Sequence, residues 1–395
     1  MSIHHDIPTD EDLARLSART EDAISIYLPA SPHPQERQTS QVALKSAVDE
    51  AIRHLRSEHP GPERPAAVLD DVRSRWQDVD SDPDVWGRLS ASLAVFLAPT
   101  TERSPGLTEV FVLPNHLQYA LTVGDHFDVG QLLRSVTYPH EAWALTLSAN
   151  RWTLWHATAE ARIAPVPVLG DHPDDANEAS HRNLERGRGD SIPLGRDEGR
   201  KLLLDQYAHR VSDAVTFELN ARHVPRDVPF FLFTAEPLLS QFTAHFLRTS
   251  IPVSGAADTL GADDLDDRVR QGLDSHYTAL AEAEVARIAD DSAAGLVATE
   301  PDRIARAAVQ GAVDTLLFNF TVELLGRLDE TTGALELLPG GERSFPDGGP
   351  ADDVLARIAV LVLRQGGQVL AVRGDEVSGP IWNRLAVAHL RHTVA

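Results

Sequence analysis

The sequence contains no cysteine among its 395 residues. Disulfide scaffolds, thiolate zinc sites and cysteine nucleophiles are therefore excluded. Lysine is also scarce: Lys45 and Lys201 are the only two, although Lys and Arg together number 36. We attribute this preference for arginine to a GC-rich genome rather than to selection for phosphate-binding side chains.

Long apolar runs are missing as well. No 18 apolar residues follow one another without interruption, which excludes a membrane-spanning helix. The first twelve residues are polar and acidic, and they lack the apolar core of a signal peptide. We therefore expect a cytoplasmic protein with no membrane partner.

Positive charge is in deficit, because 59 Asp plus Glu stand against 36 Lys plus Arg and give a formal net charge of −23. Proteins that coat DNA or RNA need many cationic side chains on phosphates, so we expect no DNA partner and only local contact with RNA. The 42% of hydrophobic residues is typical of a folded protein. The length predicts two or three domains.

The order of apolar patterns predicts an α/β fold with three consecutive α/β domains. The first domain covers residues 1–138. Its expected elements are a helix start at Thr9, a helix over 42–55, and strands over 23–28, 93–97, 110–113 and 119–123. His4 and His5 precede these elements, so we expect them at a frayed terminus and not in a metal site.

The second predicted domain covers residues 139–255. Its expected elements are a hairpin of strands over 142–148 and 151–156, a long polar loop over 170–196, a helix over 197–221, a strand over 229–233 and a helix over 237–246. A loop of that length inside a compact domain is usually functional or disordered. The loop is therefore the first place to look for a site.

The third predicted domain covers residues 256–395 and opens with an acidic helical connector. Its expected elements are helices over 264–289, 301–311 and 352–364, strands over 314–318 and 368–372, and a Gly/Pro-rich loop over 329–350. This alternation of helices and strands again predicts an α/β domain.

Common catalytic motifs are missing from the sequence. It has no G-x-S-x-G, H-E-x-x-H or Walker motif, and its 17 histidines lack metal-ligand spacing, so we expect no metal and no cofactor. Gly366-Gly367-Gln368 matches the Gly-Gly-Gln triplet of class I release factors. The triplet joins a predicted helix to a predicted strand, so we expect an ordinary helix C-cap there.

Several segments nevertheless resemble the archaeo-eukaryotic release factors and Pelota-type rescue factors. Their last domain resembles residues 314–318, 352–373 and 383–387, and their central domain resembles residues 142–157, the long loop and the following helix. The segments Asp6-Ile7-Pro8-Thr9, 25–29 and 92–97 are similar to the bacterial archaeo-eukaryotic release factor families. The resemblance covers nearly the whole chain and implies that its last two domains are the central and C-terminal domains of that family.

The resemblance also indicates a site. In the family, the loop before the long helix of the central domain carries Gly-Gly-Gln, and here this place holds Arg186-Gly187-Arg188-Gly189-Asp190-Ser191. Glycines allow close approach to a ribose or phosphate, and arginines can bind phosphates through two hydrogen bonds. Residues 181–210 hold seven Arg or Lys against five acids, a local excess of positive charge. The predicted RNA- or ribosome-binding residues are Arg182, Arg186, Gly187, Arg188, Gly189, Asp190, Ser191, Arg196, Arg200 and Lys201.

Two departures from the family limit the expected activity. Asp190 places a negative charge where the family has a neutral amide, so hydrolysis of the Gly-Gly-Gln type is not expected. The first domain lacks an Asn-Ile-Lys-Ser-like motif, so stop-codon decoding is not expected either. We expect no catalysis of the family type, and the sequence does not decide whether the chain is an enzyme.

Three hypotheses for function stay open. The leading one is a ribosome-associated factor that contacts rRNA and a tRNA end and acts by occupancy in ribosome rescue, quality control or dormancy. The second is a hydrolase or nuclease that acts on peptidyl-tRNA or tRNA ends, with Asp190 as the candidate base or metal ligand. The third is a soluble interaction protein that kept the fold without ribosome binding, with a solvated loop whose arginines are incidental.

Overall fold

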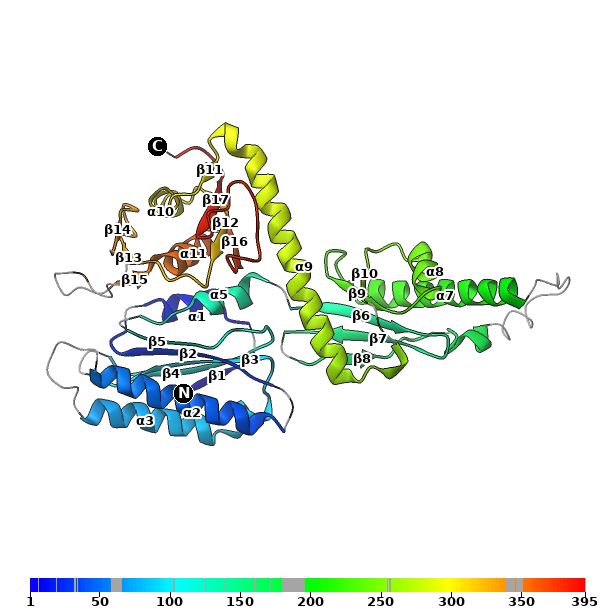
Figure 1. Ribbon diagram of the computed structural model, residues 1–395, viewed down its shortest axis with the longest axis horizontal. Helices are drawn as coiled ribbons and strands as arrows, with labels where there is room; N and C mark the ends of the chain where they lie inside the picture. Colours follow the sequence, from blue (N-terminus) through cyan, green and yellow to red (C-terminus); the bar gives the residue numbers. More distant parts are fainter. Residues whose placement is uncertain are drawn as a thin grey trace. The chain divides into compact units, whose positions relative to one another are not determined.

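The computed structural model describes residues 1–395 except 6, 19, 32, 34, 58–65, 102–103, 125, 139, 160, 171, 180–195, 254, 256, 339–344, 346–350 and 395. The chain divides into two compact units: the first is Met1–Pro139 together with His276–Ala395, and the second is His140–Ser275. Strands and helices alternate in both units (Figure 1), which confirms the predicted α/β class. The three domains 1–138, 139–255 and 256–395 stay a prediction. Among the described helices, none is long and apolar enough to cross a membrane.

The second unit is built on a five-stranded sheet of order β10-β9-β6-β7-β8. Its elements are β6 Ala142–Leu147, β7 Trp152–Ala157, β8 Ala164–Val166, α7 Arg196–Ala221, β9 Phe230–Phe233, α8 Leu238–His245, β10 Ile251–Val253, η1 Ala257–Thr259 and the first part of α9 Ala262–Asp290. The predicted hairpin is confirmed, because β6 and β7 pair antiparallel from Ala142↔Ala157 to Leu147↔Trp152. The predicted long helices are α7 and α9.

The N-terminal part of the first unit is a second five-stranded sheet, of order β1-β4-β3-β2-β5. Its elements are β1 Ser2–His4, α1 Asp10–Leu16, β2 Ala23–Pro29, α2 Arg37–Ser57, α3 Ala66–Ser81, α4 Pro83–Gly87, β3 Ser92–Ala98, β4 Leu107–Leu113, β5 Ala120–Gly124 and α5 Gly130–Thr137. The expectation of a frayed terminus at His4 was wrong: β1 pairs parallel with β4, and His4 lies opposite Phe111. β1 is short and polar, so its own sequence does not indicate a strand. Its pairing with β4, about a hundred residues later in the chain, makes it one.

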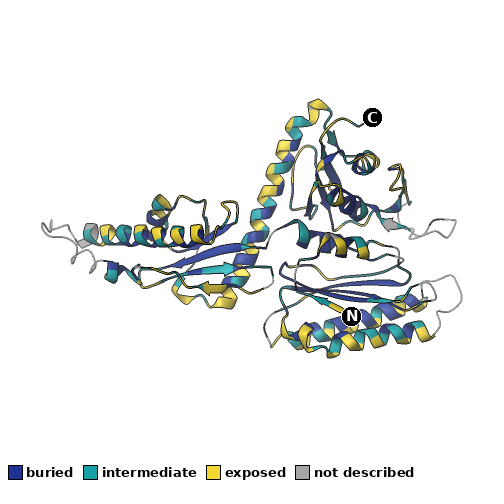
Figure 2. Ribbon diagram, turned by 180° about the vertical axis from the view of Figure 1, so that it is seen from behind, coloured by how far each residue is buried: buried dark blue, intermediate teal, exposed yellow. Residues whose placement is uncertain are grey.

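Both faces of this sheet are covered, which explains the continuous apolar runs of its central strands. In β3, Leu93, Val95 and Leu97 face a core that they share with α2 and α3. Alternate residues of the same strand, such as Phe96, face the opposite core. The two helices lie side by side against one face (Figure 1). The central strands β2, β3 and β4 are largely buried, whereas α2 and α3 have exposed outer sides (Figure 2).

The C-terminal part of the first unit adds a four-stranded sheet of order β11-β17-β12-β16 and a small three-stranded sheet of order β14-β13-β15. Its elements are η2 Asp291–Ala294, β11 Val297–Ala298, α10 Pro301–Val309, β12 Val313–Asn319, β13 Leu325–Leu328, β14 Leu335–Leu337, β15 Asp352–Asp353, α11 Val354–Arg364, β16 Gln368–Val372 and β17 Ala386–Leu390. Two expectations need correction. Residues 335–337 form a strand inside the predicted loop, and Asp352 and Asp353 pair with β13 before the helix begins.

The N-terminal and C-terminal parts of the first unit share one hydrophobic core. Leu13 and Leu16 of α1 and Leu132 of α5 pack in one cluster with Leu355 of α11 and Val369 of β16. This cluster is therefore made by residues from opposite ends of the chain. Burial of such side chains contributes roughly 1.5–3 kcal/mol each, which makes the shared core a large part of the stability of this unit.

Arg134 of α5 crosses the same junction as a buried cation. Its side chain is 3% exposed, its Nη1 donates to the carbonyl of Ala371 at 3.0 Å, and it forms an ion pair with Glu376 at 3.0 Å. The guanidinium also lies over the rings of Tyr138 and Phe320, with its Cζ 5.3 and 5.4 Å from the ring centroids. These partners offset the free-energy cost of burying the guanidinium charge. Loss of one partner would leave part of this cost without compensation.

Two buried aspartates of the first unit lie near helix starts and interact electrostatically. Asp128 accepts a hydrogen bond from the Gly130 amide at the start of α5, and Asp353 accepts one from the Leu355 amide at the start of α11. Burial, then the carboxylate of Asp128 and more weakly that of Glu323, raise the pKa of Asp353 to about 8. Burial, then Glu323, raise the pKa of Asp128 to about 6. The folded state therefore holds protons that the unfolded state releases near pH 4.

We predict that Arg134→Met lowers the free energy of unfolding by roughly 1–3 kcal/mol, because it leaves the buried carbonyl of Ala371 without its donor and leaves Glu376 with Arg373 as its remaining described cation. Urea denaturation of the full chain measures this. Arg88→Met, at an exposed position at the end of α4, is the matched control and should change stability by less than about 0.5 kcal/mol. Equal stability of the two variants would contradict the central role of Arg134.

We also predict that stability falls as pH rises from about 4 to about 8. The folded-state pKa values of Asp128 and Asp353 lie above the unfolded value, so their contribution is complete below pH 4 and is lost as each ionises. Asp353→Asn keeps a good helix cap and should flatten this pH dependence. Asp82→Asn, at the cap of α4, should leave it unchanged. Melting temperatures measured between pH 4 and 8 test both statements.

Candidate functional site

The predicted site belongs to the second unit, in the segment between β8 and α7. Seven of its ten residues lie outside the described part of the chain: Arg182, Arg186, Gly187, Arg188, Gly189, Asp190 and Ser191. Arg196 is the first residue of α7, and its side chain is not described. Arg200 and Lys201 follow on α7 and are exposed. The structure thus places three of the predicted residues at the start of one helix.

Both flanks of the segment 180–195 are attached to one core. On the preceding side, the Ala176 amide donates to the carbonyl of Ala149 at 3.0 Å, and the indole of Trp152 donates to the carbonyl of Pro173 at 2.8 Å. On the following side, Leu204 and Tyr207 of α7 pack in the same hydrophobic cluster as Ala176. Residues 176–179 also form a helical turn within the predicted loop. The sheet therefore fixes where the segment begins and ends.

The buried phenol of Tyr207, at the following flank of this segment, interacts electrostatically with several carboxylates. The Tyr207 side chain is fully buried, and its hydroxyl has no hydrogen-bond partner in the described part of the chain. Burial, then the charges of Asp175, Asp174 and Asp258, raise the pKa of Tyr207 well above its usual range. The phenol is therefore neutral at physiological pH and cannot serve as a general base.

Histidines and acids form a row along α7 that was not predicted from the sequence. His245 of α8 contacts Asp205 with Nε2 3.1 Å from Oδ1, and its ring stacks on that of His209 at a centroid distance of 4.5 Å. His209 in turn lies 3.5 Å from Asp213. The four-residue spacing on α7 was a readable signal for three of these residues. Nothing in the sequence indicated that His245 would join them.

This row has the residue types of acid–base chemistry but an unfavourable charge for RNA. A carboxylate that holds an imidazole fixes its orientation and leaves the other ring nitrogen available for proton transfer. The carboxylates of Asp205 and Asp213 repel phosphate groups. We therefore do not assign the RNA contact to this row.

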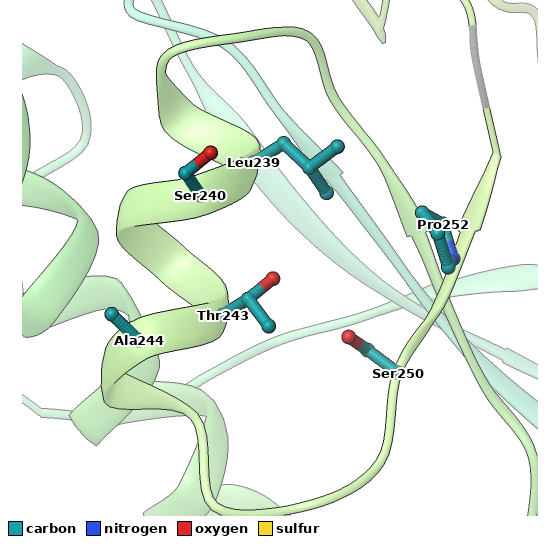
Figure 3. A pocket seen from close by; sticks show the side chains of 6 residues that line it. All are labelled: Leu239, Ser240, Thr243, Ala244, Ser250 and Pro252. Atoms are coloured by element: carbon teal, nitrogen blue, oxygen red, sulfur yellow. The ribbon is translucent and has the colours of Figure 1, made fainter.

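A pocket of about 520 Å³ lies between α8 and the segment that leads into β10. Figure 3 shows its lining, which consists of Leu239, Ser240, Thr243, Ala244, Ser250 and Pro252. Two of its hydroxyls come from α8, and Ser240 Oγ is already 2.7 Å from the carboxylate of Glu236. No lining side chain is titratable near neutral pH, so the pocket offers no acid–base group.

The Gly366-Gly367-Gln368 triplet is a structural turn, as expected. Gly366 adopts φ +71°, and the amides of Gly366 and Gly367 donate to the carbonyls of Leu363 and Val362 at the end of α11. A Cβ on Gly367 would lie 2.6 Å from the Val362 side chain. Gln368 opens β16 directly afterwards. The glycines are thus required by the helix-to-strand connection.

The hairpin, the long helix α7 and the parallel strand β9 make the second unit an α/β domain. Residues 139–281 match the family model described as bacterial archaeo-eukaryotic release factor family 8. The predicted resemblance to the bacterial archaeo-eukaryotic release factor families is thereby confirmed. A search of curated proteins gave no match.

Several solved structures show a weak likeness to this chain. The archaeal translation termination factor aRF1 is 14% identical, over 98% of this chain and 99% of that chain, with a TM-score of 0.21. Pelota of Archaeoglobus fulgidus is 15% identical, over 76% and 80%, with a TM-score of 0.36. Archaeal Pelota, described as ribosome-bound with ABCE1, is 12% identical, over 98% and 95%, with a TM-score of 0.36.

The first part of α9 packs against the sheet of the second unit. The buried Arg270 donates to the carbonyls of His140 and Thr158 at 3.2 and 2.8 Å, which ties the helix to both strands of the hairpin. Gly272 lets the helix approach β9, because a Cβ there would lie 2.4 Å from Cε1 of Phe231. This close approach requires glycine although glycine is a poor helix former.

We predict that Gly272→Ala destabilises the protein by roughly 1–3 kcal/mol, because the added methyl group collides with Phe231. At an unconstrained helical position the same change would stabilise by about 1 kcal/mol. Gly87→Ala in α4, where an added Cβ meets nothing within 4 Å, is the control and should not destabilise. Urea denaturation distinguishes the two, and a stabilised Gly272→Ala would contradict the packing argument.

Proposed function

We propose that this protein is a ribosome-associated translation factor that acts by occupancy, in ribosome rescue, quality control or dormancy. The observation that carries the proposal is the match of residues 139–281 to bacterial archaeo-eukaryotic release factor family 8. The matched segment includes residues 182–191, which stand where the resemblance places the loop that reaches the peptidyl-tRNA. In this proposal the loop contacts rRNA and a tRNA end, and the protein acts in the cytoplasm.

Charge supports a contact confined to this loop. The chain has a net charge of −23, whereas residues 181–210 have seven Arg or Lys against five acids. Arg200 and Lys201 are exposed on α7 immediately after the segment. A locally basic segment on an acidic protein can enter a phosphate-lined site while the rest of its surface is repelled by rRNA. Such a protein would bind one place on the ribosome and would not coat RNA.

The sequence of the loop supports occupancy over hydrolysis. Gly187 and Gly189 keep the backbone able to approach RNA closely, but Asp190 supplies a carboxylate in place of the amide of Gly-Gly-Gln. A carboxylate beside tRNA phosphates is repelled by them, and it would not reproduce a neutral amide that places water. We therefore propose a factor that neither decodes stop codons nor cleaves peptidyl-tRNA as release factors do.

Co-sedimentation of the purified full chain with ribosomes tests this proposal. The variant Arg186→Ala/Arg188→Ala/Arg196→Ala should bind at least tenfold more weakly, because it loses three phosphate contacts. The control Arg56→Ala/Arg88→Ala/Arg226→Ala removes the same charge from exposed positions outside the loop and should bind like the wild type.

Failure to co-sediment with ribosomes from both growing and starved cells would refute the proposal, and equal weakening of both triple variants would refute the assignment to the loop. Hydrolysis of peptidyl-tRNA that Asp190→Asn abolishes would support the enzyme hypothesis instead.

A further inference from the structure

A cluster of metal-ligating side chains lies in the first unit, away from the proposed RNA contact. His4 comes from β1, Asp12 from α1 and Glu109 from β4. One ligand atom from each lies within 4.8 Å of the other two. Three different elements thus bring an imidazole nitrogen and two carboxylates to one point, and their positions in the sequence gave no spacing signal.

The two carboxylates are held in place and carry more negative charge than their neighbour compensates. The Glu109 side chain is 6% exposed, and Arg15 donates Nε and Nη2 to its two oxygens at 2.8 and 2.7 Å. The same Nη2 lies 2.6 Å from Asp12 Oδ1, while the other Asp12 oxygen accepts from the backbone and hydroxyl of Thr9. One guanidinium therefore serves two carboxylates, which leaves one negative charge in a largely buried place.

His4 is held in place, and its Nε2 faces the carboxylate of Glu109. Its ring stacks on Phe111 at a centroid distance of 4.4 Å and an angle of 10°, and its backbone is paired in β1. Nε2 is shielded from solvent and lies 3.3 Å from Glu109 Oε2, and among the described residues it has no partner with hydrogen-bond geometry. An imidazole nitrogen beside two carboxylates is a donor set that a divalent ion can use.

We propose that His4, Asp12 and Glu109 bind a divalent transition-metal ion of the zinc class. A neutral imidazole nitrogen together with carboxylate oxygens is a ligand set for zinc and similar ions, whereas calcium and magnesium prefer oxygen ligands alone. The ion takes Nε2 of His4 as a ligand and offsets the residual negative charge, while the hydrogen bonds from Arg15 keep the two carboxylates oriented. It ties β1 and α1 to β4 and so fastens the N-terminal segment to its sheet.

A titration of the full chain with Zn²⁺ tests the site. Calorimetry measures the stoichiometry of binding, and thermal unfolding measures the change in melting temperature. One equivalent of Zn²⁺ should bind the wild type and raise its melting temperature by a few degrees, because the ion binds the folded state preferentially. His4→Gln should abolish both effects. His5→Gln removes a neighbouring imidazole and is the matched control that should keep them, which separates this site from the other histidines of the chain.

Cobalt substitution gives a readout that does not depend on stability. Bound Co²⁺ should show the visible absorption of nitrogen and oxygen ligands in the wild type and in His5→Gln. His4→Gln should lack this absorption. Asp12→Asn should bind Co²⁺ with an affinity at least tenfold lower than that of the wild type. Equal Zn²⁺ binding by His4→Gln and the wild type, or no saturable binding by the wild type, would overturn the proposal.

Discussion

The first unit depends on the buried guanidinium of Arg134. Its side chain is 3% exposed, so nearby groups must offset the cost of removing its charge from water. The partners that do so, Ala371 and Glu376, come from the opposite end of the chain. The shared hydrophobic core surrounds this contact, so α5 and β16 cannot separate without leaving both a cavity and an unpaired charge. The N-terminal and C-terminal parts therefore form one compact unit, although many residues of sequence separate them.

The second unit is organised around a different constraint, namely the attachment of a long segment to a rigid sheet. Ala176 precedes this segment and Leu204 of α7 follows it, and both side chains pack in one hydrophobic core. Gly272 allows α9 to pack closely against Phe231 of β9. A scaffold of this kind positions a functional segment whose own sequence is free to change. In the proposed function, the segment that holds Asp190 and two arginines is this variable part, within the residues that match the family model.

Elements with clear periodicity could be predicted from the sequence, and long-range contacts could not. The strand Gln368–Val372 and the helices α7 and α9 agree with expectation within a few residues. The helix Ala66–Ser81 was missed although Leu69, Val72 and Val79 follow helical spacing. In contrast, β1 is short and polar and is defined only by β4. The stacking of His245 on His209 and the cluster at His4 likewise arise from tertiary packing, which a single sequence does not encode visibly.

The central claim is that an acidic protein contacts the ribosome through one basic segment. Photo-crosslinking from single positions in the full chain, bound to ribosomes, tests this most directly. Probes at Gly187 and Gly189 should crosslink to rRNA of the peptidyl-transferase region or to a tRNA end, whereas probes on the outer side of α2, such as at Val42, should not reach rRNA. Crosslinks to rRNA from Val42 with none from the two loop positions would contradict the account.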